Sequence, residues 1–107
     1  MTFFKESDLK AKQLLPGIQL RAAFGEKTMI TIFNLDANAV IPKHKHPNEQ
    51  ITYIIKGEME FTLEGKTQVL KEGDGVIILA NQEHGARIPS GPCKAIDAWY
   101  PMREDYK

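Results

Sequence analysis

Three histidines are the residues of this chain whose type and spacing are best suited to chemistry. His44 and His46 lie two positions apart, and His84 lies much farther along the chain. Alternate residues of a strand point to the same face, so a strand through 44–46 would direct both imidazoles toward one point. Imidazole is a common ligand of divalent transition metals. The spacing indicates a chelating pair, although histidine pairs also occur on surfaces without a metal.

Gln50 follows His46 by four residues, just after the turn-like segment 47–49. The apolar run after it predicts a strand, on which Thr52 shares the face of Gln50. We therefore expect Thr52 to line the same cavity and to contact a bound substrate. Tyr53 would point to the opposite face, where a packing or dimer-contact role is favoured over a catalytic phenol.

A second group of polar residues lies near the end of the chain. Asp97 and Trp99 would share one strand face, and Arg103 follows beyond Pro101. An acid that faces an apolar interior is costly unless it has a partner or a task, so Asp97 could move a proton. Arg103 could hold a carboxylate with two parallel hydrogen bonds. The alternatives are a structural ion pair of Asp97 with Arg103 or Arg87, and Trp99 as core filling.

Arg21 is a further candidate for binding an anion. It lies in the early run IQLRAAFG, where it alternates with apolar neighbours. A strand there would place its side chain either at the mouth of a barrel, as a substrate-binding group, or in solvent. The pattern does not decide between the two.

The elements that must position these residues are short strands. Glycine and proline punctuate the chain, and the runs between them are rich in β-branched and aromatic residues, which is typical of an all-β sandwich or barrel. Turns are expected at 56–58 and 64–66, and a short helix is suggested over 7–15. The clearest predicted strands cover 29–35, 51–56, 59–63 and 75–80.

Length and composition restrict the function classes. The 107 residues suit one domain, and its small core makes a homodimer plausible. Fourteen acidic and fourteen basic residues without a basic stripe argue against a nucleic-acid partner. No apolar stretch is long enough for a membrane span, and no secretion signal is recognisable. With a lone Cys93, which we expect to be a small buried hydrophobe, these features favour the cytoplasm.

Two runs resemble the motifs of the cupin superfamily. HKHPNEQITYIIKGEMEF is similar to the first motif and GDGVIILANQEH to the second, although the family usually has Pro and Gly where Leu79 and Asn81 stand here. The resemblance implies a single-domain jelly-roll β-barrel over 1–107, with its core at about 15–101. It also implies one divalent ion, whether Ni, Zn, Fe, Mn or Co, bound by four ligands: His44, His46, Gln50 and His84.

Gln50 stands where most cupins have a glutamate. A neutral ligand set leaves the charge of the ion uncompensated, which makes the ion a stronger Lewis acid. The neighbouring Glu49 would point to the other strand face and is not expected to bind the ion.

The tail of the chain and the HPNEQ run resemble the KdgF family of pectin-degradation cupins. That family converts 4,5-unsaturated monouronates into linear ketonised sugars, and its catalytic Asp, aromatic residue and Arg fall on Asp97, Trp99 and Arg103. The aromatic residue is commonly Phe, so Trp99 could reshape the pocket. The resemblance implies a small anionic, sugar-acid-like substrate that is opened and tautomerised.

Other functions fit the same residues. One alternative is a small cupin dioxygenase that uses Fe or Mn with O₂. Another is a binding module that holds a small anion through its metal without turnover. A structural cupin without metal is the remaining possibility.

Overall fold

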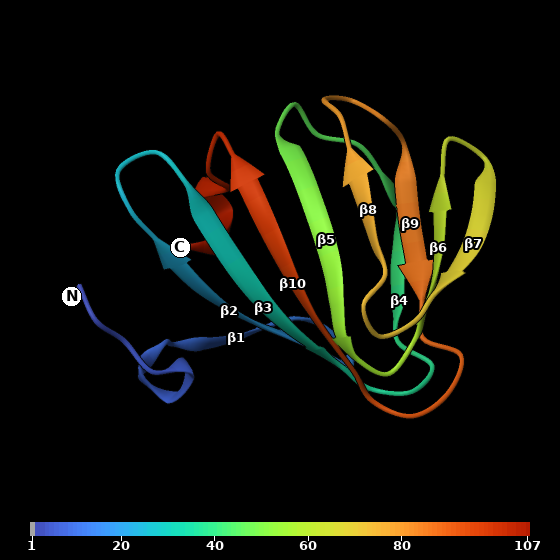
Figure 1. Cartoon of the computed structure of the whole chain (residues 1–107), viewed down its shortest axis with the longest axis horizontal. Coiled ribbons are helices and arrows are strands. Elements are labelled where there is room, and N and C mark those ends of the chain that lie inside the picture. The colour runs from blue at the N-terminus through green and yellow to red at the C-terminus, as the bar shows by residue number, and fades with distance from the viewer. Residues whose placement is uncertain (1) are drawn as a thin grey trace.

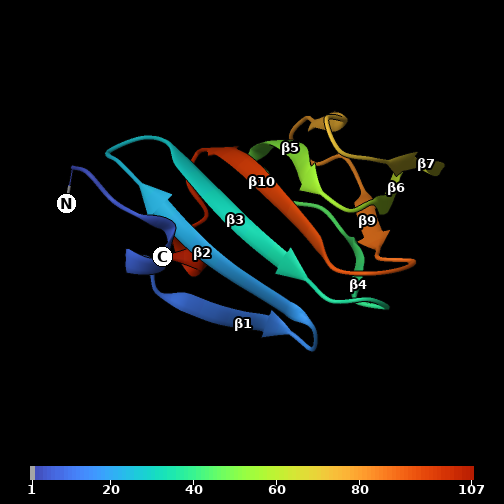
Figure 2. The same cartoon turned by 60° about the horizontal axis from the view of Figure 1, so that its bottom comes forward.

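The protein is described by a computed structural model over residues 2–107, in which two antiparallel sheets face each other (Figure 1). Figure 2 shows the larger sheet on one side and the smaller sheet on the other. In spatial order, the six-stranded sheet contains β1 (Ala11–Leu15), β2 (Ile18–Phe24), β3 (Met29–Leu35), β10 (Cys93–Tyr100), β5 (Glu49–Lys56) and β8 (Gly75–Ile78). The four-stranded sheet contains β4 (Val40–His44), β9 (His84–Arg87), β6 (Met59–Leu63) and β7 (Lys66–Leu70).

The interior between the sheets is built from alternate residues of each strand. On β5 and β10, buried and more exposed side chains alternate almost without exception, as the strand period requires. Leu20, Phe33, Ile54 and Phe61 belong to the apolar core that these alternations assemble. The expected all-β jelly-roll barrel is confirmed. Among the described residues, no helix is long and apolar enough to cross a membrane.

The predicted helix over 7–15 is wrong. Only the short 3₁₀ helix η1 (Glu6–Asp8) forms there, and the rest of the segment is β1, which pairs with β2. The turn at Gly17, whose φ is +74°, allows this hairpin, and backbone pairing outweighs a weak helical preference. A second 3₁₀ helix, η2 (Glu104–Tyr106), follows β10.

Several predicted strands and turns are confirmed. The run 29–35 is β3 and the run 59–63 is β6, both with the predicted bounds, whereas the run 75–80 ends earlier, at Ile78. Gly57 has a φ of +80°, and a Cβ there would lie 2.4 Å from the Pro92 carbonyl oxygen, so only glycine fits this turn. Asn81 has a φ of +64°, which asparagine tolerates better than most residues.

Candidate metal centre

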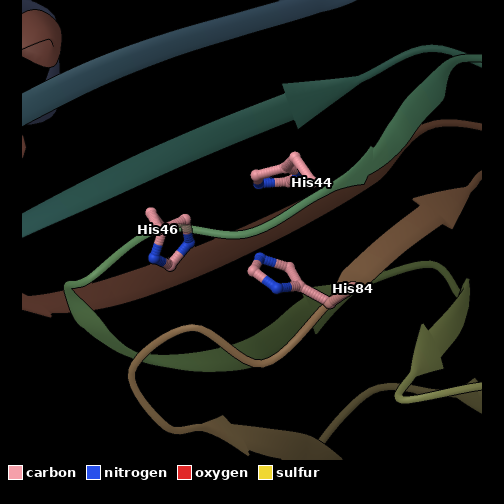
Figure 3. Close-up of side chains that lie close together, drawn as sticks. All are labelled: His44, His46 and His84. Carbon is pink, nitrogen blue, oxygen red and sulfur yellow. The ribbon is translucent and has the colours of Figure 1, made fainter.

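The three histidines converge in the interior between the two sheets (Figure 3). Their candidate ligand nitrogens all lie within 4.8 Å of one another. His44 ends β4 and His84 begins β9, and the two residues are direct partners across that pair of strands. His46 lies two residues beyond the end of β4, so the expectation that one strand carries both His44 and His46 is wrong in detail. The convergence itself is confirmed.

A close approach of two backbones brings β9 against β4. A Cβ at Gly85 would lie 2.9 Å from the Ile41 carbonyl oxygen and 3.2 Å from the Lys43 amide nitrogen. The absence of a side chain at Gly85 therefore lets β9 pack closely enough to place His84 beside His44. Their ring centroids are 4.3 Å apart.

Each imidazole is oriented by a backbone carbonyl. The Nδ1 atoms lie 2.8 Å from the Pro42 oxygen for His44, 3.0 Å from the Asn48 oxygen for His46, and 2.8 Å from the Gln82 oxygen for His84. A carbonyl only accepts, so Nδ1 must carry the proton and Nε2 presents its lone pair. This arrangement is typical of histidines that ligate a metal.

Gln50 completes a donor set that fits a cation. Its Nε2 donates to Thr52 Oγ1 at 2.9 Å, which leaves its Oε1 3.0 Å from His46 Nε2. Both of these atoms present lone pairs, so a positive charge is needed to stabilise them side by side. Three imidazole nitrogens and one amide oxygen suit a divalent transition metal without selecting one.

Burial keeps two of the histidines neutral. Desolvation lowers the pKa of His84 to about 4 and also lowers the pKa of His46, while their hydrogen bonds to backbone carbonyls act in the opposite direction. Neutral imidazoles can bind a metal at neutral pH without first losing a proton.

Asp97 lies on β10, opposite Thr52 of β5, with its side chain in the interior. Burial raises its pKa to about 7, and hydrogen bonding from Thr52 and Gln50 opposes that rise. Its Oδ1 has no hydrogen-bond partner. The alternative of a structural ion pair is wrong, because Arg87 pairs with Glu60 and Arg103 with Asp105.

Trp99 and Arg103 form one side of the site. Arg103 was expected there, beside the metal ligands. Trp99 Nε1 donates to Thr31 Oγ1 at 2.9 Å, and its ring meets the His46 ring at a centroid distance of 5.2 Å. Arg103 lies over the Trp99 ring, but its Nε and Nη2 both donate to Asp105, at 3.1 and 3.0 Å. The Nε and Nη2 edge of the guanidinium is therefore taken, so the expected grip of Arg103 on a ligand carboxylate stays a prediction that would have to use the Nη1 side. Nη1 is buried without a partner.

A cavity of about 40 Å³ lies between these groups. It has room for an ion or a few waters, so a larger ligand would extend beyond it. Thr52 does not line this cavity but an adjoining one of about 20 Å³, whose walls also include Gln50 and Asp97. It is buried under Gln50, in contact with the amide, where it supports a ligand side chain. The walls of the larger cavity include His44, Gln50, His84, Asp97, Trp99 and Tyr106.

Arg21 is not part of the site. It is paired with Ile32, on the outer face of the six-stranded sheet, whereas its neighbour Leu20 points into the core. Its Nη1 lies within hydrogen-bond distance of the Glu6 and Leu9 carbonyl oxygens, so it anchors the N-terminal segment. The substrate-binding expectation for Arg21 is wrong, because strand alternation assigns it to a face that never meets the cavity.

Three residues that the sequence interpretation did not select also shape the site. Tyr106 is buried, meets Trp99 edge to face and lies beside the guanidinium of Arg103, and Asp105 holds Arg103. Asn48 is buried, and its Nδ2 donates to the Pro101 oxygen at 2.7 Å. Through this bond the loop that carries His46 holds residues 101–107, which we call the C-terminal arm. The one signal in the sequence was the position of Asn48 between two ligands.

Comparison with known proteins gives consistent results. The Cupin domain family matches residues 31–99. The pectin degradation protein KdgF of Dickeya dadantii (strain 3937) is 26% identical over 106 residues, 97% of this chain and 96% of that protein. The structure of KdgF from Halomonas sp. is 29% identical, covers 100% of this chain and 99% of that chain, and has a TM-score of 0.93. The H2HPP isomerase of Bacillus subtilis is 32% identical over 97 residues, 88% of this chain but 41% of that protein.

Proposed function

Because the chain belongs to the cupin family and is a small cupin resembling KdgF, we propose that it is a metal-dependent enzyme acting on a small sugar acid. The proposed reaction is the ring opening and tautomerisation of a 4,5-unsaturated uronate. The names of two relatives, a pectin degradation protein and an isomerase, support proton-transfer chemistry of this kind.

One observation carries the proposal. Among the described residues, three side chains have a buried polar atom without any hydrogen-bond partner: His84 Nε2, Asp97 Oδ1 and Arg103 Nη1. His84 and Asp97 line the cavity, and Arg103 lies against Trp99 and Tyr106, which also line it. A buried polar atom without a partner is costly, and three in one place are expected where a ligand supplies the partners.

The proposed ion ligands are His44, His46, Gln50 and His84. A divalent ion held there would polarise an oxygen of the substrate.

Each remaining residue has a separate task. Asp97, whose pKa of about 7 allows it to gain or lose a proton near neutrality, moves a proton between carbon and oxygen. Arg103 Nη1 donates to one oxygen of the substrate carboxylate. Trp99 supplies the apolar wall that excludes water on that side.

The decisive experiment follows the loss of the ultraviolet absorbance of an unsaturated galacturonate in protein loaded with Ni, Zn, Fe, Mn or Co in turn. We expect turnover with at least one of these metals and loss of most of it in Asp97→Asn, since the variant cannot transfer a proton. Glu49→Gln is the matched control, because Glu49 is exposed on the opposite face of β5. Full activity in Asp97→Asn would remove the proposed role of the acid.

The same preparations separate the alternatives. Oxygen consumption coupled to substrate loss in the Fe or Mn form would indicate a dioxygenase. Binding of the sugar acid without product would indicate a binding module. Metal content below about a tenth of an equivalent after loading would leave a structural cupin.

We also propose that the single domain forms a homodimer through the outer face of the six-stranded sheet. Ile51, Tyr53 and Ile77 lie on that face with between 44% and 61% of each residue exposed. The outer face of the other sheet is mixed, since the exposed Arg87–Glu60 ion pair lies there beside the exposed Val40 and Val69. A strand that is apolar on both faces is typically covered on both.

Sedimentation or light scattering tests this interface. We expect about twice the mass of one chain for the wild type and the mass of one chain for Tyr53→Glu. The control is Thr67→Glu on β7 of the four-stranded sheet. A single-chain mass for the wild type at micromolar concentration would overturn the dimer.

A further inference from the structure

The guanidinium of Arg103 is held on one edge by a carboxylate and is contacted by two aromatic rings. Its Nε and Nη2 donate to the two carboxylate oxygens of Asp105, at 3.1 and 3.0 Å. The centres of the Trp99 and Tyr106 rings lie 5.1 and 4.2 Å from its central carbon. Contacts of this kind stabilise a guanidinium in one plane and one orientation.

The edge of the guanidinium that includes Nη1 is left over from this arrangement. Nη1 is buried and has no partner, while the rings of Trp99 and Tyr106 that enclose the guanidinium also line the cavity with Asp97. Only 16% of the Arg103 side chain is exposed, so the group is set into the wall of the site. The free donor is therefore beside the cavity, in a fixed position.

We propose that Asp105 and Tyr106 are positioning residues that fix the guanidinium of Arg103, so that its free Nη1 edge anchors the anion of the substrate. The Asp105 carboxylate also balances the guanidinium charge. Because that charge is balanced, the anchor selects by the position of the oxygens of the anion more than by charge, which favours a planar monoanionic carboxylate over a phosphate dianion. The identity of the anion rests on the proposed function, whereas the positioning of Arg103 does not.

The first test needs neither metal nor substrate. Trp99 is the single tryptophan of the chain, so its fluorescence reports directly on the stacked guanidinium. We expect Asp105→Asn to increase the acrylamide quenching of Trp99 about twofold, because the freed Arg103 exposes the ring. Glu104→Gln is the control: it lies on the same 3₁₀ helix, and Glu104 pairs with Lys107 instead.

The second test measures binding of two probes that differ only in the anion at carbon six, D-galacturonate and D-galactose 6-phosphate, to metal-loaded protein by calorimetry. We expect the wild type to bind galacturonate at least about tenfold more tightly, and Asp105→Asn to lose most of that preference. With a turned-over substrate, Asp105→Asn should raise KM about tenfold with kcat within about twofold.

The outcomes are distinct. Unchanged quenching and unchanged probe preference in Asp105→Asn would overturn the positioning role. Altered quenching together with tighter binding of the phosphate probe by the wild type would overturn the selection for a carboxylate. Altered quenching and carboxylate preference without any turnover would support this inference while contradicting the proposed enzyme.

Discussion

The two sides of the site are organised by different means. On the histidine side, each imidazole of His44, His46 and His84 is oriented by a main-chain carbonyl two residues away. On the side of the C-terminal arm, Arg103 is held by other side chains, Asp105, Trp99 and Tyr106. The first side depends on the path of the backbone, and the second on contacts that a single substitution removes.

This difference has a consequence for variation. A main-chain carbonyl is present whatever residue supplies it, so the orientation of the ligands tolerates changes at Pro42, Asn48 and Gln82. The contacts of the C-terminal arm do not tolerate such changes, since each of them depends on residue type. We infer that the metal site is the constant part of the molecule and that the arm is where substrate preference is set.

The largest effect is expected on metal affinity, when a ligand on the histidine side is removed. His84→Ala removes a ligand from β9, and we expect metal affinity to fall by at least about 100-fold. Loss of a ligand lowers the affinity more than loss of a residue that only orients a ligand. Competition against a chromogenic chelator measures it. Lys45→Ala, between His44 and His46 but exposed, is the control. A fall of less than tenfold would mean that the cluster does not hold the ion.

The second prediction concerns pH in the metal-free protein. Asp97 has a folded-state pKa of about 7 against a usual 3.8, so between these values only the folded state holds the proton, and the free energy of unfolding falls as pH rises. His84, lowered from 6.5 to about 4, acts oppositely, and its contribution is lost as pH falls through that range.

Asp97→Asn should therefore be more stable than the wild type at pH 8, by on the order of 4 kcal/mol, since each pKa unit corresponds to about 1.4 kcal/mol. Near pH 4 the two proteins should be similar, and the stability of the variant should rise with pH between 4 and 6.5. Urea unfolding with chelator present measures both. Equal stabilities at pH 8 would show that Asp97 ionises at little cost.

A smaller effect is expected from changing the charge of the donor set. Gln50→Glu should tighten metal binding about tenfold, because a carboxylate compensates part of the charge of the ion. The same change removes the donor to Thr52 and sets a second acid near Asp97. We expect lower turnover in spite of tighter binding, and an unchanged affinity would indicate that Gln50 is not a ligand.

The smallest predicted effect sharpens the comparison between the two sides. Asn48→Ala keeps the carbonyl that accepts from His46 but deletes the bond to the Pro101 oxygen. We expect stability to fall by about 1 kcal/mol, the usual cost of a lost buried hydrogen bond, with metal affinity within about threefold of the wild type. Thermal unfolding and chelator competition measure these. A large loss of metal affinity would mean that the two sides are not independent.

Most of the histidine side could be predicted from the sequence. The spacing of His44, His46 and Gln50 and the strand alternation placed Gln50 inward and Glu49 outward, as the structure has them. The pairing of His44 with His84 could not be derived, because it depends on the register of two strands forty residues apart.

The arm was less predictable. Asp97 and Trp99 follow from strand alternation, but Asp105 and Tyr106 lie after the last strand, where no periodicity applies. Arg21 lies within a strand, but its position was still not predictable, since alternation gives two faces without saying which one meets the cavity. The local pattern predicts which side chains share a face of a strand, and only the assembled sheets decide what that face contacts.

β4 is an edge strand of the four-stranded sheet, and its pairing with β9 is interrupted between Ile41 and His44. His44 and His84 come from these two strands and Gln50 from the opposite sheet. An ion bound by all three would therefore link the edge strand β4 to both sheets. Open strand edges recruit other chains. We therefore expect protein stripped of metal to aggregate sooner on storage than the loaded form, so that the ligand cluster also protects the molecule against self-association.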